Sequence, residues 1–447
     1  MGENVMTSQV SSSAATVTRD EYLQSLLSLC SGYFLDADLI KVVQKPAATW
    51  LSRLRMPNRK DEAWRFTDLS ELLATSFVAA DKVTPESVEE FVIPEAASSR
   101  VTFVNGVYAP DLSNLKGLPE GLFVGNLAQL PAEYQTQLSQ YLTQQKGAEE
   151  VFTSLNSAGF ADVAVVWADA NTVVETPLHL LFLSIAGASP SFSQPRILVV
   201  AERNSSLQII EQYATNQDTA YFTNSVAEIY LAENAAVQHI RCQQEATSSF
   251  HIGKTGIAQA RDSRYTCHSI SLGGKLSRHN LEVHQTGEQI TTNLNGLTVV
   301  NGKQLADLHS LIALTKPHAT TDQLQKCLVA GNARSVFDGQ VLVPKEAQLT
   351  NASQLNRNLL LSPQAHVDTK PQLQITADNV KCSHGATVSQ LEAEELFYLS
   401  SRGLNEEAAR SLLIEAFTAE IIQRIPIKSI QKQLTANIKK AIKGNKQ

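Results

Sequence analysis

The sequence predicts a mainly β protein: a parallel β-helix, or β-solenoid, flanked by helical regions at both ends of the chain. From about residue 172, short β-rich segments follow one another for about 200 residues, and many alternate apolar with polar positions. A degenerate turn repeat runs through the same region. Two-residue hairpin signals are scarce there, although an antiparallel sandwich, the rival fold, would use them. These three observations favour the solenoid, whose stacked turns bury one continuous core.

The 447 residues correspond to roughly three folding units, at about 150 residues per domain. The Ser/Thr-rich opening is followed by Thr18 and Glu21, which form a capping-box pattern ahead of an amphipathic helix. We expect a disordered segment over 1–18, a mainly helical domain with short strands over 19–170, the β-helix over 171–389 and a C-terminal helical domain over 390–447.

The turn repeat consists of a polar turn-like residue, a small residue, a variable position and an apolar residue. Its apolar positions lie 18 to 30 residues apart where copies are adjacent, a suitable length for one coil of a solenoid. The segment Thr320–Cys327 also allows a short helix, and Asp338-Gly339 is the main hairpin-type dipeptide. The copies are 234–237, 346–349, 364–367 and 385–388, with a looser one at 204–207.

After residue 388 the hydrophobic period becomes helical. A short helix is expected to start near Leu391 and to stop at Gly403, a residue suited to the C′ position. Asn405 caps a second helix. The range 428–447 contains six Lys and no acidic residue, so it is either a solvated basic face or a docking surface for an acidic partner. Its apolar side repeats at four-residue steps, at Ile430, Leu434, Ile438 and Ile442.

Composition excludes several classes of protein. Lys and Arg number 37 and Asp and Glu 44, a net charge of −7 that argues against nucleic acid as the main partner. Five cysteines are too few for a disulfide-stapled secreted domain, so we expect a reducing compartment. We find no secretory signal pattern and no apolar stretch of about 18 residues. We therefore expect a cytoplasmic protein without a membrane partner, with the plastid stroma as the alternative compartment.

The sequence contains no phosphate-loop, GxSxG, HExxH or CxxC signature. The strongest remaining candidate site is the segment Lys381–Val388. On an extended strand, Cys382 and His384 are two residues apart and project to the same face. A thiolate beside an imidazole suits soft or borderline metals, including iron–sulfur centres. Two ligands cannot close a tetrahedral site, so further ligands would come from neighbouring turns or another chain. The alternative interpretation is a buried cysteine and a hydrogen-bonded histidine that end the solenoid.

Other pairs of cysteine and histidine are weaker candidates. Cys267 and His268 are adjacent and would face opposite sides of a strand, and His279 and His284 flank a strand and are expected at the surface. Trp64 lies in the charged segment KDEAWRFTDL and is interpreted as an amphipathic anchor for the N-terminal region, with a binding role as the alternative.

Three stretches together resemble the SufB/SufD family, components of the SUF machinery for iron–sulfur cluster assembly. They are KDEAWRFTDL, the dipeptide Asp338-Gly339 and the long stretch from Lys370 to Ile422. The sequence Cys-Ser-His-Gly-Ala-Thr is more similar to the SufD branch, because the SufB branch carries a different cysteine-bearing sequence there. The resemblance implies a right-handed parallel β-helix between helical regions.

The resemblance also implies partners and a site. SufD pairs with SufB through the β-helices, each is thought to bind the ABC-type ATPase SufC through its C-terminal helices, and a transient cluster is thought to form at the SufB–SufD interface. By resemblance, His384 supplies the iron ligand there, while Cys382 is a less certain ligand. The residues that would contact SufC are Leu396, Phe397, Arg402, Gly403, Glu407, Ala408, Leu412 and Phe417.

On this basis the chain would be non-enzymatic, without catalytic residues and without a nucleotide of its own. No cluster is expected in the isolated chain, which could form a homodimer, and a contact with flavin is left open. Two other classes remain as alternatives: a carbohydrate-active β-helix enzyme, which would need clustered carboxylates on a groove, and a passive structural solenoid that forms a homodimer.

Overall fold

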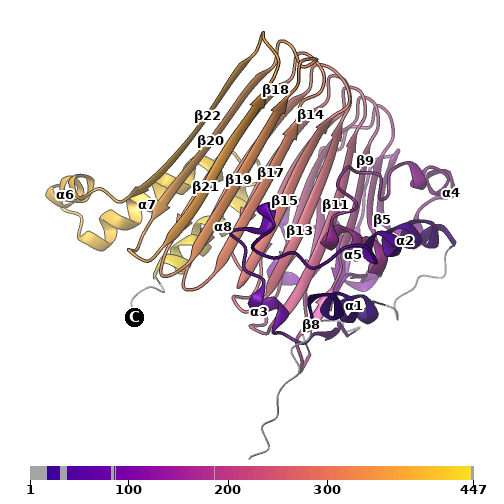
Figure 1. Cartoon of the computed structure of the whole chain (residues 1–447), viewed down its shortest axis with the longest axis horizontal. Helices are drawn as coiled ribbons and strands as arrows, with labels where there is room; N and C mark the ends of the chain where they lie inside the picture. Colours follow the sequence, from indigo (N-terminus) through magenta and orange to yellow (C-terminus); the bar gives the residue numbers. More distant parts are fainter. Residues whose placement is uncertain (1–17, 31–37, 82–84, 86, 186, 444–447) are drawn as a thin grey trace, which may run out of the picture.

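The chain forms a β-solenoid of two parallel sheets, with helices before and after it in the sequence (Figure 1). This computed structural model describes residues 18–30, 38–81, 85, 87–185 and 187–443. The prediction of a mainly β protein with a parallel β-helix between helical regions is confirmed. The segment expected to be disordered, apart from Thr18, lies outside the described residues.

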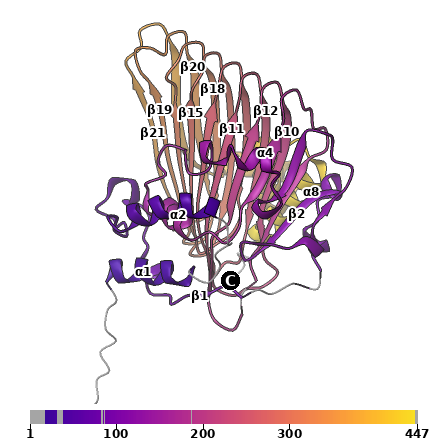
Figure 2. The same ribbon diagram turned by 90° about the vertical axis from the view of Figure 1, so that its right-hand side faces the viewer.

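Successive strands of the solenoid alternate between the two sheets, and each strand pairs in parallel with the strand one full turn later. Ser206 pairs with Ala236 and Asn351 with Lys381, so the repeat is 30 residues at both places. Figure 2 shows the strands stacked along one direction. The first sheet contains β9 (Arg196–Ala201), β11 (Tyr221–Leu231), β13 (Phe250–Gln259), β15 (Leu276–Gln285), β17 (Leu305–Ala313), β19 (Arg334–Val343) and β21 (His366–Ile375). The second sheet contains β7 (Leu178–Leu183), β10 (Ser206–Ala214), β12 (Ala236–Gln244), β14 (Arg264–Ser271), β16 (Thr291–Val300), β18 (Thr320–Val329), β20 (Asn351–Leu360) and β22 (Lys381–Gln390).

Along one edge of the solenoid, the chain turns at residues with positive φ, and these corner residues stack above one another in successive turns. The backbone N–H of Asn204 donates to the carbonyl of Glu233, and that of Asn234 donates to Arg261, so each corner rests on the next turn. The side-chain amide of Asn234 donates to Oδ1 of Asn204 at 3.0 Å. Asparagine suits this left-handed conformation. The corners are Asn171, Asn204, Asn234, Asp262, Gln289, His318 and Leu349.

Three local expectations were wrong. The segment that allowed a short helix is β18, and its backbone pairs with β16 and β20. Asp338-Gly339 lies in the middle of β19 and not in a hairpin. A side chain at Gly339 would crowd the interior, since a Cβ atom would lie 2.5 Å from Nε2 of Gln354 and 2.5 Å from the Phe337 ring. The repeat copy 385–388 likewise lies within β22 and not at a corner.

The N-terminal region covers the outer face of the first sheet and also extends both sheets. The predicted capping box of Thr18 and Glu21 is present at the start of α1 (Arg19–Leu29). The region also supplies strands to both sheets: β6 pairs with β9, and β2 pairs with β7. Both sheets therefore continue across the domain boundary that was expected at residue 170. The region's other elements are α2 (Asp38–Leu51), α3 (Ser70–Leu73), α4 (Ala132–Gln135), α5 (Val151–Gly159), β1 (Val78–Ala79), β2 (Ser99–Val104), β3 (Val107–Tyr108), β4 (Asn114–Leu115), β5 (Leu122–Asn126), β6 (Ala164–Ala168) and 3-10 helices at Glu62–Trp64, Glu89–Phe91, Pro94–Ala96, Pro110–Leu112, Leu127–Gln129 and Leu138–Gln140. The short strand β8 (Ser191–Ser193), which comes after β7, pairs with β1 and β11.

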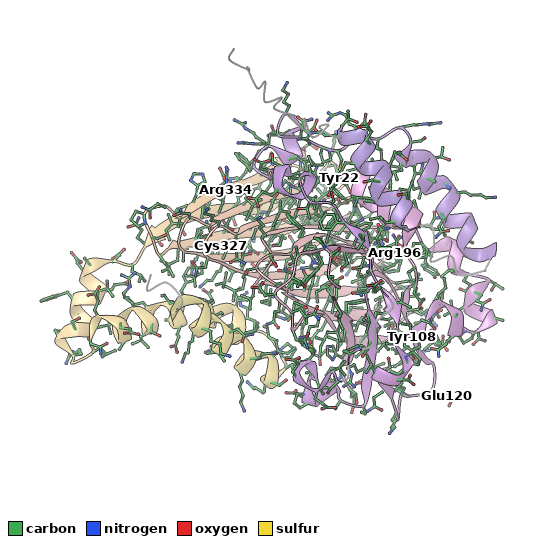
Figure 3. The ribbon with its side chains drawn as sticks, turned by 90° about the horizontal axis from the view of Figure 1, so that it is seen from below. Tyr22, Tyr108, Glu120, Arg196, Cys327 and Arg334 are labelled. Atoms are coloured by element: carbon green, nitrogen blue, oxygen red, sulfur yellow. The ribbon has the colours of Figure 1, made fainter. Side chains whose placement is uncertain are left out.

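Three helices follow the solenoid: α6 (Ala393–Ser401), α7 (Glu406–Ile422) and α8 (Lys428–Lys443). Asn405 caps α7, as predicted, by accepting a hydrogen bond from the backbone of Ala408. The outer face of the second sheet packs against α7 and α8 through one apolar cluster, whereas α6 buries none of its residues and extends beyond the strands (Figures 1 and 3). The predicted apolar side of α8 is buried at Ile430, Leu434 and Ile438, while the side chain of Ile442 lies outside the described part.

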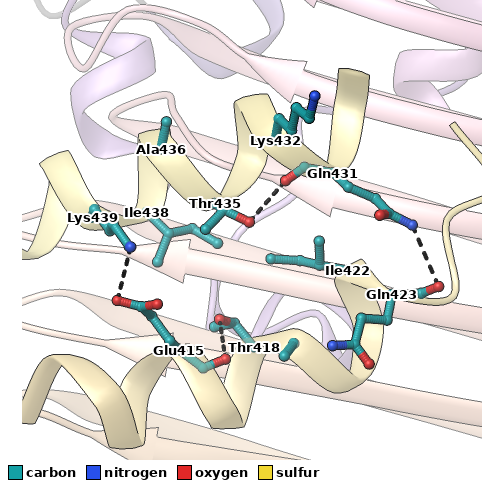
Figure 4. Close-up of a pocket in the computed structure, with 11 residues that line it drawn as sticks. Glu415, Thr418, Ile422, Gln423, Gln431, Lys432, Thr435, Ala436, Ile438 and Lys439 are labelled. Atoms are coloured by element: carbon teal, nitrogen blue, oxygen red, sulfur yellow. Dashed lines mark hydrogen bonds and ion pairs between the residues drawn. The ribbon is translucent and has the colours of Figure 1, made fainter. Parts of the chain in front are cut away.

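Helices α7 and α8 line a groove between them with a volume of about 530 Å³, shown in Figure 4. At its rim, Nζ of Lys439 lies 3.1 Å from Oε1 of Glu415. The hydroxyl of Thr435 donates to the backbone oxygen of Gln431 at 2.8 Å. None of the helices in the described residues is both long and apolar enough to cross a membrane.

Candidate functional site

The solenoid ends in an open turn made of β21 and β22. Within the described residues, β21 pairs only with β19 and β22 only with β20, so each strand leaves one edge unpaired. Side chains along β22 are half-buried or exposed, whereas those of β20 are largely buried. Unpaired strand edges readily accept another strand, and proteins normally block them. This end of the molecule is therefore suited to contact with another chain.

Cys382 and His384 both lie on this last strand and project to the face that continues the solenoid interior. In the strand register, Cys382 stands over Ala352 and His384 over Gln354, and both lower residues are buried. Cys382 is half-buried and packs against the interior apolar cluster, while His384 is exposed. The strand alternation predicted this shared face.

The chemistry available at the two side chains differs. Burial raises the pKa of the Cys382 thiol, although a hydrogen bond involving the backbone of Ala352 opposes the shift. Binding of a metal or another electrophile would favour loss of the thiol proton. The described residues contain no group of three or more His, Cys, Asp and Glu side chains that could hold a metal ion. A metal held by Cys382 and His384 would need ligands from another chain.

Sequence analysis missed a polar interior that leads to the open turn. A column of in-register residues on the second sheet runs inside the solenoid towards His384, and neighbouring columns contain further amides and hydroxyls. The expectation that His279 and His284 lie at the surface was wrong, because they are only 4% and 7% exposed. His279 lies inside and hydrogen bonds with Thr255 at 3.0 Å. The column is His239, Cys267, Leu294, Gln323, Gln354 and His384.

Charged groups are also buried deeper in this interior. Nε2 of His239 lies 2.9 Å from Glu211, whose other carboxylate oxygen lies 3.3 Å from Nε of Arg241. Burial alone would lower the pKa of His239, but hydrogen bonds with Cys267 and Glu211 and the Glu211 charge raise it to about 9. These charges are paired, as buried charges must be.

The remaining cysteines have structural surroundings. Cys30, Cys242, Cys267 and Cys327 are buried, and Cys327 lies within the body of the solenoid (Figure 3). Its sulfur accepts from the amide of Gln325 at 3.7 Å. Cys267 and the adjacent His268 face opposite sides of β14, as predicted, since only Cys267 belongs to the interior cluster.

The segment KDEAWRFTDL acts as an anchor on the first sheet. Trp64 is 6% exposed and lies in an apolar cluster with residues of α1, α5 and the sheet's outer face. Nζ of Lys370, on β21, lies 2.7 Å from Glu62, so the segment reaches the last turn. The contacts support the anchoring interpretation of Trp64.

The residues expected by resemblance to contact SufC lie on α6, on α7 and in the turn between them, where three large apolar side chains are exposed. These side chains are Phe397, Tyr398 and Leu412, and they are 75%, 57% and 46% exposed. Leu396 is half-buried, and Phe417 lies against the solenoid, with Nζ of Lys326 4.5 Å from its ring centre. The other expected residues, Arg402, Gly403, Glu407 and Ala408, are exposed.

Fold and site together define a β-solenoid protein with helical flanks and an uncapped last turn. Residues 183–417 match the family described as "SUF system FeS cluster assembly, SufBD core domain". Residues 34–180 match the "SufBD protein N-terminal region". The chain therefore belongs to the SufB/SufD family of iron–sulfur cluster assembly proteins.

Relatives of known name agree with this assignment. An iron–sulfur cluster assembly SufBD family protein of Synechocystis sp. is 50% identical, with 93% of this chain and 94% of the relative covered. Protein ABCI7, chloroplastic, of Arabidopsis thaliana is 35% identical, with 89% and 85% covered. Iron-sulfur cluster assembly protein SufD of Escherichia coli is 31% identical, with 88% and 91% covered. The chain is SufD-like within its family.

Proposed function

We propose that this chain is a non-enzymatic component of the SUF complex that holds a nascent iron–sulfur cluster between itself and SufB. The observation that carries the proposal is the place of His384, which is exposed on the unpaired last strand of the solenoid. Membership of the SufB/SufD family favours cluster assembly over the carbohydrate-active enzyme that a β-helix alone would allow.

SufB is proposed to bind the open turn. The two unpaired edges, one from each sheet, offer main-chain donors and acceptors to two strands of a partner solenoid. Val388, on the same face of β22 as His384, is 50% exposed and would be covered by such a partner. This arrangement would continue the solenoid interior from one chain into the other.

The cluster would form at this junction as cargo of the complex. Neutral imidazole is a good ligand for iron, and His384 is accessible to it. Cys382 would add a thiolate after losing its proton, and SufB would complete the ligand set. The isolated chain would hold no stable cluster, because two side chains leave the coordination sphere open.

SufC is proposed to bind the exposed side chains of Phe397, Tyr398 and Leu412. Exposed aromatic residues surrounded by polar ones are typical of protein interfaces. The guanidinium of Arg402 lies 5.4 Å from the Tyr398 ring centre and would place a positive charge at the border of this interface. ATP would be bound by SufC, and this binding would bias the complex between a buried and an open form, because nucleotide favours closure of the ATPase pair.

The compartment is proposed to be reducing. All five cysteines are free thiols, and four of them are buried without a partner cysteine. We favour the cytoplasm, with the plastid stroma as the alternative.

The test is the composition of the native complex. The tagged chain is purified anaerobically, and its companions are identified by native mass spectrometry with iron analysis. We expect SufB and SufC in stoichiometric amounts, and Val388→Glu should release SufB while SufC stays bound. Val173→Glu, a change at another exposed valine (60% exposed), is the control. A homodimer without iron, insensitive to nucleotide, would instead support the passive solenoid.

A further inference from the structure

The residue directly below His384 in the stacked turns is Gln354. The two are register partners across β20 and β22, and their side chains project to the same interior face. Gln354 is only 2% exposed, whereas His384 is exposed on the open turn. The glutamine amide therefore forms part of the buried floor beneath the strand position that carries His384.

A chain of hydrogen bonds fixes the orientation of this amide. Nε2 of Gln354 donates to Oε1 of Gln323 at 2.9 Å. The Gln323 amide is held in turn, because its Nε2 donates to the hydroxyl of Ser310 at 2.9 Å. The bond to Gln323 fixes which way the Gln354 amide faces and leaves its oxygen free to accept a hydrogen bond from the turn above.

That oxygen is buried and lacks a hydrogen-bond partner in the part of the chain that the structure describes. Buried polar atoms are nearly always paired, so a free acceptor at this place calls for a donor. His384 occupies the register position directly above Gln354, and its exposed side chain can rotate at little cost. In its neutral form the ring has one N–H to donate and one lone pair to offer elsewhere.

We propose that Gln354 is the positioning residue of His384. Its amide oxygen accepts the imidazole N–H, which selects one neutral tautomer and aims the lone pair of the other ring nitrogen out of the open turn. Histidines that bind metals commonly donate their second nitrogen to a carbonyl or carboxylate in this way. The inference rests on the proposed role of His384. It assigns Gln354 as the residue that orients the His384 imidazole for binding iron.

The same strand provides a matched control. Asn358 is also a fully buried amide on the interior face of β20, and its Oδ1 is likewise without a partner among the described residues. Its register partner on β22 is Val388, which has no donor to offer. A change at Asn358 perturbs a similar buried amide without touching the floor beneath His384.

The test is the tautomeric state of His384 in the full-length chain, measured by ¹⁵N NMR of histidine-labelled protein at a pH where the ring is neutral. His384→Gln identifies the signals. We expect well-separated shifts for the two ring nitrogens, the sign of one tautomer, in the parent chain. Gln354→Met should bring the two shifts together. Asn358→Leu should leave them apart, and Gln354→Glu should too, since its carboxylate still accepts.

Unchanged shifts in Gln354→Met, in protein shown by thermal unfolding to be folded, would overturn the proposal, as would a mixed tautomer in the parent chain. Cluster assembly by His384→Ala in cells separates this result from the wider function. If His384→Ala assembles clusters fully while the ring-nitrogen shifts converge in Gln354→Met, the positioning role stands and the role of His384 in assembly is refuted. Lost assembly with unchanged shifts would refute only the positioning role.

Discussion

The guanidinium carbon of Arg278 lies 4.0 Å from the centre of the Trp64 ring. Arg278 is on the outer face of β15, and Trp64 belongs to the charged segment near the N-terminus. Asp307, on the next strand of the sheet, pairs with Arg278 at 2.5 Å and accepts a hydrogen bond from the hydroxyl of Thr67. A cation–π contact and a buried ion pair thus connect the N-terminal region to the middle of the solenoid.

Replacing Trp64 tests this anchor. Trp64→Ala should lower the free energy of unfolding by about 3–5 kcal/mol, because it removes a buried ring and uncovers Arg278. Urea denaturation followed by circular dichroism measures the change. Phe397→Ala is the control, since that ring is 75% exposed and its loss should cost no more than about 0.5 kcal/mol. Equal losses in the two variants would contradict the anchoring role.

Local signals in the sequence were enough to predict several parts of this protein. The caps at Thr18 and Asn405 are side chains that accept hydrogen bonds from backbone N–H groups three residues later, so they can be recognised without knowing the fold. The shared face of Cys382 and His384 follows from strand alternation alone. These features depend only on neighbouring residues.

Features that depend on the next turn could not be predicted in the same way. Gln323 and Gln354 are buried and hydrogen bond to each other across neighbouring turns, whereas alternation normally assigns polar residues to solvent. His284 is buried on the outer face of a strand because other elements cover that face. Gly339 resembled a turn residue, but it lies inside the solenoid, where a Cβ atom would crowd the amide of Gln354 on the facing sheet.

His384→Ala should reduce cluster assembly by about tenfold or more, because even the loss of an outer partner of a metal ligand has effects of this size. Cluster delivery to a client protein, measured in cells and in the reconstituted complex, provides the readout. His366→Ala is a matched control: its side chain is 61% exposed and lies on the same last turn, but on the outer face of β21. A fully active His384→Ala variant would refute the proposed ligand.

Cys382→Ser separates a ligand from a packing residue. A hydroxyl replaces the thiolate with little change in size, so a ligand role predicts about tenfold less cluster assembly with stability changed by less than about 1 kcal/mol. A packing role predicts the reverse: lower stability, with assembly by the folded fraction unchanged. The control is Cys267→Ser, which buries a hydroxyl in the core and should reduce stability.

Phe397→Ser should weaken binding of SufC by about 10- to 30-fold, since aromatic residues at the centre of an interface often contribute about 2 kcal/mol. Isothermal titration of the purified chain with SufC measures the affinity. Because Phe397 is exposed and α6 buries none of its residues, the thermal stability of the chain should not change. Val173→Ser should bind SufC normally; similar weakening by both changes would place the interface elsewhere.

A buried neutral histidine should make the protein sensitive to acid. His179 lies within β7, and its Nε2 hydrogen bonds with Oε1 of Gln212 at 2.9 Å. Burial lowers the pKa of His179 to about 3, the Gln212 hydrogen bond opposes the shift, and the Arg100 charge adds to it. In the unfolded chain the pKa is about 6.5. Between these values the unfolded chain binds a proton that the folded protein does not, so stability falls as pH decreases.

The expected slope for this one group is at most about 1.4 kcal/mol per pH unit, from about pH 6.5 downward. Urea unfolding at intervals between pH 7 and pH 4 measures it. His179→Gln should flatten the dependence, because glutamine cannot take up the proton in either state, even if the variant is less stable at pH 7. His366→Gln, at an exposed histidine, should keep the slope of the parent chain. An identical slope in His179→Gln would show that other groups cause the sensitivity to acid.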